Sequence, residues 1–278
     1  LTKKTKKQFG STRIMDLKDL NLMRFIIVMK NSLFSDNKTF IIAEIGNNHN
    51  GDFDRAIKMI DDAKDAGADC VKFQMRHIKE VYRERSLEKD GEDLGTEYVI
   101  DLLKQFELTV EEHKKIAEYC SKKDILYMCT AWDNKSIKVL ESFDVSAYKV
   151  ASADLTNMPL LEELSSTKKP LILSTGMSDL TNVKEAVERF KETGNKTLIL
   201  LHCLSSYPAN ENEMNLRALK TLKDNFNIPI GLSDHFPGIE ISLMSIGLGG
   251  YVVGRSAEKI IPKLTENYGA SEDPPDTS

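Results

Sequence analysis

The stretch FIIAEIGNNHNGDFD, residues 40–54, decides the fold. Its first seven residues are mostly apolar and predict a buried strand. The strand carries one acid and ends in a glycine, after which three asparagines and a histidine follow. Residues 53–69 then repeat apolar side chains at helical spacing, with a stop signal at Gly67. A strand that ends in hydrogen-bonding groups and leads into a helix is one β/α unit.

The same unit recurs along the chain, because short apolar stretches alternate with charged, amphipathic ones. Near-continuous apolar strands are typical of a parallel sheet that is buried on both faces. About eight repeats favour the α/β class and a (β/α)8 TIM barrel over an open sheet. No GxGxxG follows the first strand, which argues against a dinucleotide-binding fold. The predicted strands are residues 40–46, 70–74, 126–131, 147–152, 171–176, 198–203, 228–234 and 251–255.

The composition is that of an ordinary soluble protein, with 41% hydrophobic and 29% charged residues in 278. A net charge of -5 argues against nucleic-acid binding, which usually needs a basic face. The four cysteines are scattered, without a CxxC pair, and predict neither a disulfide framework nor a structural zinc site. A cytoplasmic location is the default for such a chain. The longest early apolar stretch, residues 22–29, is far shorter than the ~20 residues of a membrane span.

The connection after the second strand, residues 76–108, is longer than a normal one. It is rich in charge, with RERSLEKDGEDLG in its middle. A lid or binding loop and a solvated excursion with a short helix explain this segment about equally well.

In a barrel of this type the active site lies at the carboxyl ends of the strands. Nearly every predicted strand ends in charged or hydrogen-bonding side chains, so the loops are expected to converge over one pocket. Lys72 and Lys149 lie within otherwise apolar stretches, where an unpaired ammonium is costly. They predict an anionic ligand, a phosphate or a carboxylate, or alternatively a Schiff-base amine.

Other polar side chains at the strand ends allow a structural or a functional interpretation. His202, between two apolar neighbours, is interpreted as a packed, hydrogen-bonded histidine. His235 precedes FPG, an exposed turn, and fits metal binding better. Serines at four strand ends either cap the following helices or donate hydrogen bonds to phosphate oxygens beside helix N-termini. These serines are Ser152, Ser174, Ser205 and Ser233.

Six segments resemble the sialic acid synthase family, whose members are nonulosonic acid synthases. In chain order they are AEIGNNHNG, AGADCVKFQ, AYKVASADLTNMPLL, LILSTGMS, LLHCLSSYP and IGLSDHFPGIEISL. The resemblance implies condensation of phosphoenolpyruvate with N-acetylmannosamine, a related amino sugar or its 6-phosphate. It also implies a TIM barrel, a small C-terminal domain similar to type III antifreeze protein, a domain-swapped homodimer and a divalent metal, usually manganese.

The resemblance also assigns roles to residues that match the family's motifs. Lys72 and Lys149 would hold the charges of phosphoenolpyruvate, and Glu44 would manage the proton of the attacking water or hydroxyl. His235, in SDH, would ligate a metal that polarises the sugar aldehyde. The residues facing the sugar or phosphoenolpyruvate would be Gln74, Asp154 and Tyr207. Hydrogen bonds to the phosphate or carboxylate would come from Thr130, Ser152, Ser174, Ser205 and Ser233.

The sequence departs from the family pattern at four positions, two of them among the residues just named. Asp154 stands where many members have Glu, and Ser205 where many have Asn, which leaves the acceptor sugar open. After IGLGG the family continues into a strand ending in E-K/R-H-F/I-T, whose histidine is the second metal ligand. By alignment the acid becomes Gly254 and the histidine becomes Ser256. Losing one of two imidazoles is expected to weaken metal binding by orders of magnitude.

The two ends of the chain set the expected domain boundaries. The chain begins with Leu, and Met29 opens a segment with the character of a natural start, so residues 1–28 are expected to be an extension outside the fold. Residues 29–255 are expected to form the barrel, and residues 256–278 an atypical tail in place of the antifreeze-like domain. A candidate final helix in that tail is interrupted by Pro262, which leaves open how perfectly the last β/α unit closes the barrel.

Three functions remain open on this basis. The first is an active synthase in which another residue replaces the lost histidine. The second is a truncated, weakly active or inactive barrel that still binds phosphoenolpyruvate. The third is a Schiff-base aldolase that uses Lys149 or Lys72, which the barrel favours and the serines and SDH disfavour.

Overall fold

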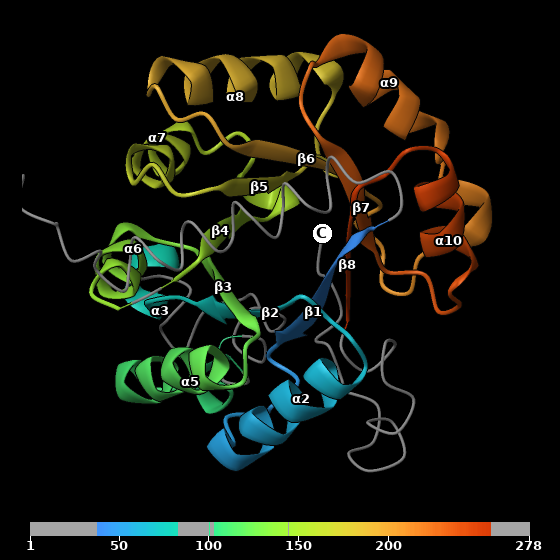
Figure 1. Cartoon of the computed structure of the whole chain (residues 1–278). Helices are drawn as coiled ribbons and strands as arrows, with labels where there is room; N and C mark the ends of the chain where they lie inside the picture. Colours follow the sequence, from blue (N-terminus) through green and yellow to red (C-terminus); the bar gives the residue numbers. More distant parts are fainter. Residues whose placement is uncertain (1–37, 83–99, 101–102, 144, 257–278) are drawn as a thin grey trace, which may run out of the picture.

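Eight parallel strands form a closed barrel in the computed structural model, which describes residues 38–82, 100, 103–143 and 145–256 (Figure 1). Each strand pairs with the next one in the sequence, as the alternation of apolar and amphipathic stretches predicts. The strands are β1 Phe40–Gly46, β2 Cys70–Met75, β3 Leu126–Ala131, β4 Ala147–Val150, β5 Leu171–Ser174, β6 Leu198–Cys203, β7 Ile230–Asp234 and β8 Val252–Ser256.

The last strand completes the barrel, which answers the question that the sequence left open. β8 pairs with β7, where Ser233 lies opposite Gly254, and with β1, where Phe40 lies opposite Val252. The predicted TIM barrel is therefore confirmed at the level of its strands. The expected extension over residues 1–28 lies outside the described residues, as does the tail beyond Ser256.

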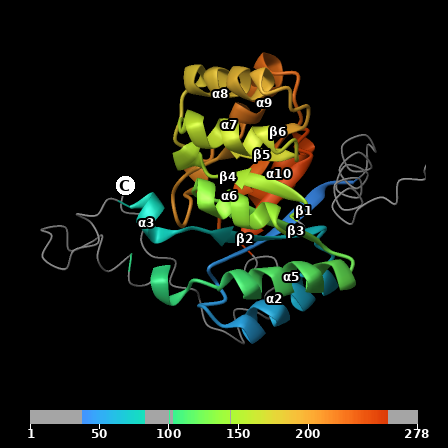
Figure 2. The ribbon, with the colours of Figure 1, turned by 90° about the vertical axis from the view of Figure 1, so that its left-hand side faces the viewer.

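The helices lie around the outside of the barrel (Figures 1 and 2). Capping boxes begin two of them, with Thr109 and Glu112 before α5 and Asp179 and Asn182 before α8. The two between β6 and β8, α9 and α10, are not among the helices that the sequence pattern singled out. The bounds are α2 Phe53–Asp65, α3 Ile78–Val81, α5 Val110–Lys122, α6 Asn134–Glu141, α7 Met158–Ser166, α8 Leu180–Glu192, α9 Arg217–Asn225 and α10 Glu240–Gly247.

An apolar cluster composed of strand residues fills the interior of the barrel. On β1 it contains Phe40 and Ile42, and on β3 Leu126 and Met128, all at most 2% exposed. Because successive side chains of a strand point to opposite faces, the residue two positions further along also points inward. On β1 that residue is Glu44. The interior therefore changes from apolar to polar toward the carboxyl ends of the strands.

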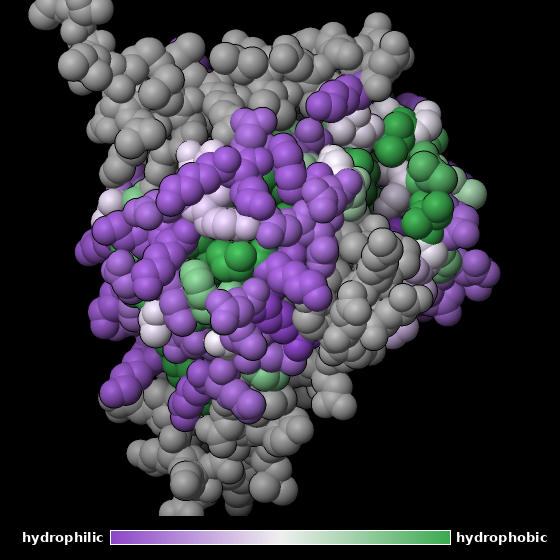
Figure 3. Space-filling model, turned by 60° about the horizontal axis from the view of Figure 1, so that its bottom comes forward, coloured by the Kyte–Doolittle hydropathy of each residue, from purple (hydrophilic) through white to green (hydrophobic). Residues whose placement is uncertain are grey.

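The surface of α10 is unusually apolar. In Figure 3 hydrophilic side chains cover most of the described face, and hydrophobic ones gather at the right-hand edge, the side on which α10 lies in Figure 1. Within the described ranges, five of the eight large hydrophobic side chains that are exposed belong to α10 or its flanks. They are Ile239, Leu243, Met244, Ile246 and Leu248, with exposed fractions of 39–60%. The amphipathic pattern that identifies the other helices is thus missing from α10.

The described part of the chain contains no helix that is both long and apolar enough to cross a membrane. All four cysteines are buried and free. Most of the connection after β2 lies outside the described residues. Its first part, before residue 83, contains the short helix α3.

Candidate active site

Five polar side chains point inward at the carboxyl end of the barrel, and we call them the inner polar set. Each one follows by two positions a residue of the inner apolar cluster on the same strand. The alternation that buries the cluster therefore also brings these side chains together at the mouth of the barrel. The inner polar set consists of Glu44, Lys72, Thr130, Lys149 and Ser174, which follow Ile42, Cys70, Met128, Ala147 and Ile172.

Lys72 links three strands at this mouth. Its ammonium forms an ion pair with the Glu44 carboxylate of β1 and donates a hydrogen bond of 3.1 Å to the Thr130 hydroxyl of β3. Burial and the nearby ammonium of Lys149 lower the pKa of Lys72 well below 10.5, and Cys129 opposes this effect. Two lysines close enough to affect each other concentrate positive charge at one place, which favours an anionic ligand.

Lys149 is the second buried ammonium. Its Nζ atom donates to the backbone carbonyl of Val150 at 2.9 Å, and the residue is 7% exposed. Burial lowers the pKa of Lys149 to about 8, while Cys203 and Asp154 act in the opposite direction. Near neutral pH this lysine is therefore mostly protonated and incompletely neutralised.

Three buried oxygen atoms of the predicted site residues have no hydrogen-bond partner among the described residues. They are Oε1 of Glu44, Oδ2 of Asp154 and the hydroxyl of Ser174. A buried polar atom without a partner costs free energy, so such atoms commonly face a ligand or a water. Burial also raises the pKa of Asp154, against the effects of Asn157, Arg76 and Lys149. The unpartnered atoms occur where the sequence predicts a substrate.

Ser152 and Ser205 meet at Gly176, just beyond β5. The backbone N–H of Gly176 donates to the Ser152 hydroxyl at 3.0 Å. A Cβ atom at this glycine would lie 2.6 Å from the carbonyl oxygen of Cys203 and 2.8 Å from the Ser205 hydroxyl, so glycine is required for this close approach. Both serines therefore border the mouth, and Ser152 is engaged in a structural hydrogen bond.

Tyr207 and His235 stack against each other at the ends of β6 and β7. Their ring centroids are 4.0 Å apart with an interplanar angle of 28°, and Tyr207 is 51% exposed. Nδ1 of His235 lies 2.8 Å from the carbonyl oxygen of Leu204, so this nitrogen carries the proton and the lone pair is on Nε2. Ser233 lies on β7, opposite Gly254 of β8.

Two other histidines have structural contacts. Nε2 of His202 lies 2.7 Å from the carbonyl oxygen of Met214, which confirms its interpretation as a packed, hydrogen-bonded residue. His49 follows β1 but is 2% exposed, and its Nδ1 accepts a hydrogen bond from the N–H of Gly51. Burial lowers the pKa of His49 to about 4, so it is neutral near pH 7.

The sequence model of the NeuB family matches residues 59–256, which is more than half of the chain. The chain belongs to the NeuB family.

Several NeuB-family relatives are similar over most of this chain. An uncharacterized protein of Methanocaldococcus jannaschii is 45% identical over 215 residues, 77% of this chain and 60% of its own length. N,N'-diacetyllegionaminic acid synthase of Legionella pneumophila is 39% identical over 234 residues, 80% of this chain and 65% of its own. The chain thus spans 60–66% of the length of the first curated relatives it matches.

A solved structure supports the same assignment. It is that of N-acetylneuraminic acid synthetase from Leptospira borgpetersenii serovar Hardjo-bovis in complex with citrate. That protein is 33% identical to this one, with a TM-score of 0.72, and the match covers 87% of this chain and 89% of that chain. The resemblance drawn from the sequence motifs is therefore confirmed at the level of the family.

The described residues do not fit the manganese site that resemblance to the NeuB family implies. His235 has a suitable imidazole, but Ser256 stands where the family's second histidine ligand is expected. Over the described ranges, no group of three or more His, Cys, Asp or Glu side chains is placed to hold a metal. In this NeuB-family chain β8 therefore lacks the expected histidine ligand.

Arg76 and Trp132 lie at the mouth of this NeuB-family barrel, although the sequence analysis assigned neither to the site. Arg76 directly follows β2 and donates to the side-chain oxygen of Gln74. Its Cζ atom lies 4.9 Å from the centroid of the Trp132 ring, just after β3. The available signal was position alone, since each is the first or second residue beyond a predicted strand.

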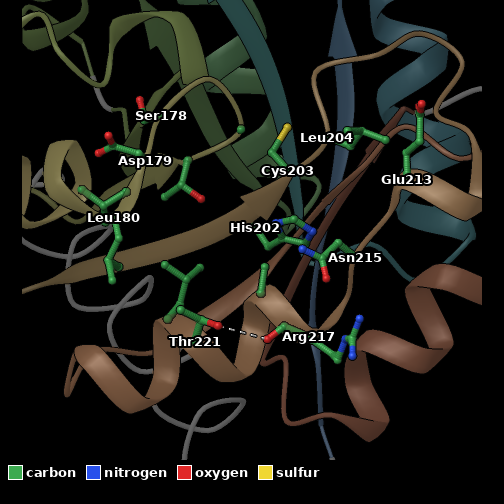
Figure 4. Close-up of a pocket in the computed structure, with 15 residues that line it drawn as sticks. Ser178, Asp179, Leu180, His202, Cys203, Leu204, Glu213, Asn215, Arg217 and Thr221 are labelled. Carbon is green, nitrogen blue, oxygen red and sulfur yellow. Dashed lines mark hydrogen bonds between the residues drawn. The ribbon is translucent and has the colours of Figure 1, made fainter.

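A cavity of about 420 Å³ lies between α8 and α9 (Figure 4), and its lining extends to Gly176 and Cys203 at the ends of β5 and β6. Its lining includes Asp179 and Leu180 at the start of α8 and Arg217 and Thr221 of α9. No member of the inner polar set lines it. The chemistry of the side chains therefore places the candidate active site at the mouth and not in this cavity.

Proposed function

We propose that this chain condenses phosphoenolpyruvate with N-acetylmannosamine, a related amino sugar or its 6-phosphate. The products would be a sialic-acid-type nonulosonic acid and inorganic phosphate. The observation that supports this most strongly is the pair of buried lysines, Lys72 and Lys149, among unpartnered polar atoms at one barrel mouth. A cytoplasmic location and a homodimer are part of the proposal, and light scattering of the purified protein would test the dimer.

The two lysines bind the phosphate and carboxylate groups of phosphoenolpyruvate. Both are 7% exposed, so their charges are weakly screened by water and attract an anion strongly. Thr130 already contacts Lys72, and the hydroxyl of Ser174 is buried without a partner, so each hydroxyl can donate to a substrate oxygen. Ser205 and Ser233 contribute further hydroxyl groups at the ends of β6 and β7.

In the condensation, C3 of phosphoenolpyruvate forms a bond to the aldehyde carbon of the open-chain sugar. Water adds at C2, and the C–O bond to phosphate then breaks and releases inorganic phosphate. The aldehyde oxygen gains a proton and the attacking water loses one, so a carboxylate at the reacting atoms can move both. Glu44 serves this role, because Lys72 holds one carboxylate oxygen and Oε1 is unpartnered.

Gln74, Asp154 and Tyr207 bind the acceptor sugar. Asp154 has an unpartnered buried oxygen that can accept from a sugar hydroxyl, and Tyr207 presents an exposed ring beside His235. The shorter reach of Asp compared with Glu leaves room for a bulkier acceptor substituent. No step here depends on the manganese site, because Ser256 replaces the second of its two expected histidine ligands.

A barrel that binds phosphoenolpyruvate without turning it over is the second candidate. The observation in its favour is Ser256 at the end of β8, where the family has its second histidine ligand. The pKa of about 8 for Lys149 also gives a Schiff-base aldolase a specific argument, since a desolvated lysine is a better nucleophile. Borohydride trapping with pyruvate separates this third reaction from the other two, because a covalent adduct requires the Schiff base.

The deciding experiment combines calorimetry and an assay of phosphate release. Phosphoenolpyruvate is titrated into the wild-type protein and into Lys72→Met, and phosphate release is then followed with a panel of mannosamine derivatives, with and without manganese. Binding and sugar-dependent release in the wild type alone support the proposal. Binding without release supports the second candidate, and no binding at all refutes both. Manganese titration into Ser256→His, beside the wild type, measures what the missing histidine ligand contributes.

A further inference from the structure

Arg76 contacts the side chains through which the proposed synthase would recognise its acceptor. Its guanidinium donates a hydrogen bond to Oε1 of Gln74 and stacks on the ring of Trp132, 4.9 Å from the centroid. It also lies close enough to the Asp154 carboxylate to oppose the rise in its pKa. Arg76 therefore contacts Gln74 and lies near Asp154, and both of these residues are proposed to face the sugar.

The hydrogen bond from Arg76 determines how the carboxamide of Gln74 is oriented. A guanidinium has donors but no acceptor, so its partner must be the amide oxygen. The amide nitrogen then faces the opposite way. A Cβ atom at Gly46 would lie 3.3 Å from Nε2 of Gln74 and 3.2 Å from Oε1 of Glu44, so these two atoms border the same space. The amide nitrogen of Gln74 therefore borders the same space at the mouth as the unpartnered carboxylate oxygen of Glu44.

Trp132 keeps the guanidinium in place. Stacking over an indole ring and a hydrogen bond to an amide oxygen restrict both the tilt and the direction of the planar group. Arg76 is half-buried, and partial burial lowers the pKa of its guanidinium, yet Tyr82 and Glu107 oppose that effect and an arginine remains charged. The orientation of Gln74 is thus set by a rigid charged donor and not by solvent.

We propose that Arg76 is a positioning residue that holds the amide N–H groups of Gln74 toward the acceptor sugar. This inference rests on the proposed function and extends it to the chemistry of the recognised group. Gln74 then recognises an oxygen that accepts hydrogen bonds, such as the aldehyde or acetamido carbonyl oxygen of the acceptor. A sugar whose substituent at this point can only donate hydrogen bonds would be rejected, because that donor would face the N–H donors of Gln74.

A double-mutant cycle tests this role. N-acetylmannosamine and its 6-phosphate are titrated by calorimetry, with phosphoenolpyruvate present, into the wild type, Arg76→Met, Gln74→Ala and the double variant. We expect Arg76→Met to weaken sugar binding about tenfold and phosphoenolpyruvate binding less than twofold. In the Gln74→Ala background the same change should weaken sugar binding less than twofold, because the group that Arg76 positions is already absent.

Three further variants separate positioning from a general structural role. Arg76→Lys keeps a donor to the amide oxygen and should recover part of the affinity. Gln74→Glu keeps an acceptor for Arg76 but loses the N–H donors, so it should bind sugar as weakly as Gln74→Ala. Lys79→Met removes an exposed cation from the neighbouring helix α3 and should change nothing. Trp132, the one tryptophan in the sequence, reports on the same place, because bound sugar should change its fluorescence.

The outcomes are distinct. Sugar binding that Arg76→Met leaves unchanged, or additive effects of Arg76→Met and Gln74→Ala, would overturn the inference and leave the proposed function standing. Equal losses of sugar and phosphoenolpyruvate binding would overturn it too, since they indicate a general structural effect. Sugar binding absent from the wild type would remove the acceptor part of the proposed function together with the inference.

Discussion

Replacing Lys149 by Met should make the protein more stable at neutral pH while it abolishes anion binding. The side chains are similar in length, but Met carries no charge into the buried mouth of the barrel. The pKa of Lys149 is lowered from 10.5 to about 8, so the protonated amine is disfavoured in the folded state. At about 1.4 kcal/mol for each pH unit, this difference corresponds to about 3 kcal/mol of lost stability near pH 7.

The net gain is smaller, because Lys149 also donates to the carbonyl of Val150. A hydrogen bond of this kind contributes about 1 kcal/mol, so the variant should gain about 2 kcal/mol at pH 7. The sign of the pH dependence follows from the protons bound. Between pH 8 and pH 10.5 the unfolded lysine is protonated and the folded one is not, so wild-type stability rises over this range. The advantage of Lys149→Met should therefore disappear by about pH 10.5.

Urea unfolding of the wild type and Lys149→Met at pH 7 and pH 10 measures these differences in stability. Calorimetric titration of phosphoenolpyruvate at pH 7 measures the loss of binding, which should be at least tenfold. Lys114→Met, which replaces an exposed lysine of α5, is the control and should change stability by less than about 0.5 kcal/mol. A destabilised Lys149→Met at pH 7, or a gain that stays the same at pH 10, would refute the account of Lys149 as a costly buried charge.

Three further predictions concern other parts of the barrel. Arg255→Met should cost about 3–5 kcal/mol in urea unfolding, because it leaves the fully buried carboxylate of Asp234 without its ion-pair partner; an unchanged midpoint would contradict this. Gly231→Ala should lower the melting temperature, because its Cβ would clash with a β8 carbonyl. Gly254→Ala is the control and should leave the melting temperature nearly unchanged, because its Cβ would meet nothing within 4 Å. Equal melting temperatures of the two variants would count against the close approach of Gly231 to β8. Acceptor binding should weaken as pH falls through the raised pKa of Asp154, and Asp154→Asn should remove that dependence in calorimetric titrations across the acid range; the same slope in both proteins would argue against a role for this carboxylate.

The strands and the inner polar set could be predicted because both depend on the pattern of apolar and polar residues within a short stretch of sequence. Lys72 and Lys149 are polar residues at inward positions of apolar strands, and this is visible without knowing any long-range contact. The predicted ends of β4 and β5 were two residues too long, since Ser152 begins a short 3-10 helix and a turn begins at Gly176. Each of these two strands thus ends where residues of the candidate active site begin.

Arg76 and Trp132 could not be predicted as members of the site, because their role depends on contacts between β2, β3 and β4. In the sequence Arg76 begins a charged connection, where an arginine is usually solvated. Helix α10 escaped notice for a different reason, since it is apolar on most sides and lacks the periodicity of its neighbours. The missing carboxylate at Gly254 was visible in the sequence, whereas the open space around it needed the structure.

The alternation that separates inner from outer side chains also limits how this barrel can diversify. On β2, Lys72 points into the mouth, and its neighbours Val71 and Phe73 pack outward in the main core. Inserting or deleting one residue before Lys72 would turn both apolar side chains inward and the ammonium outward, and would do so for every residue of the strand beyond. New acceptor preferences are therefore accessible through point substitutions and through changes in the loops, whereas length changes within a strand remove the anion site and the core packing together.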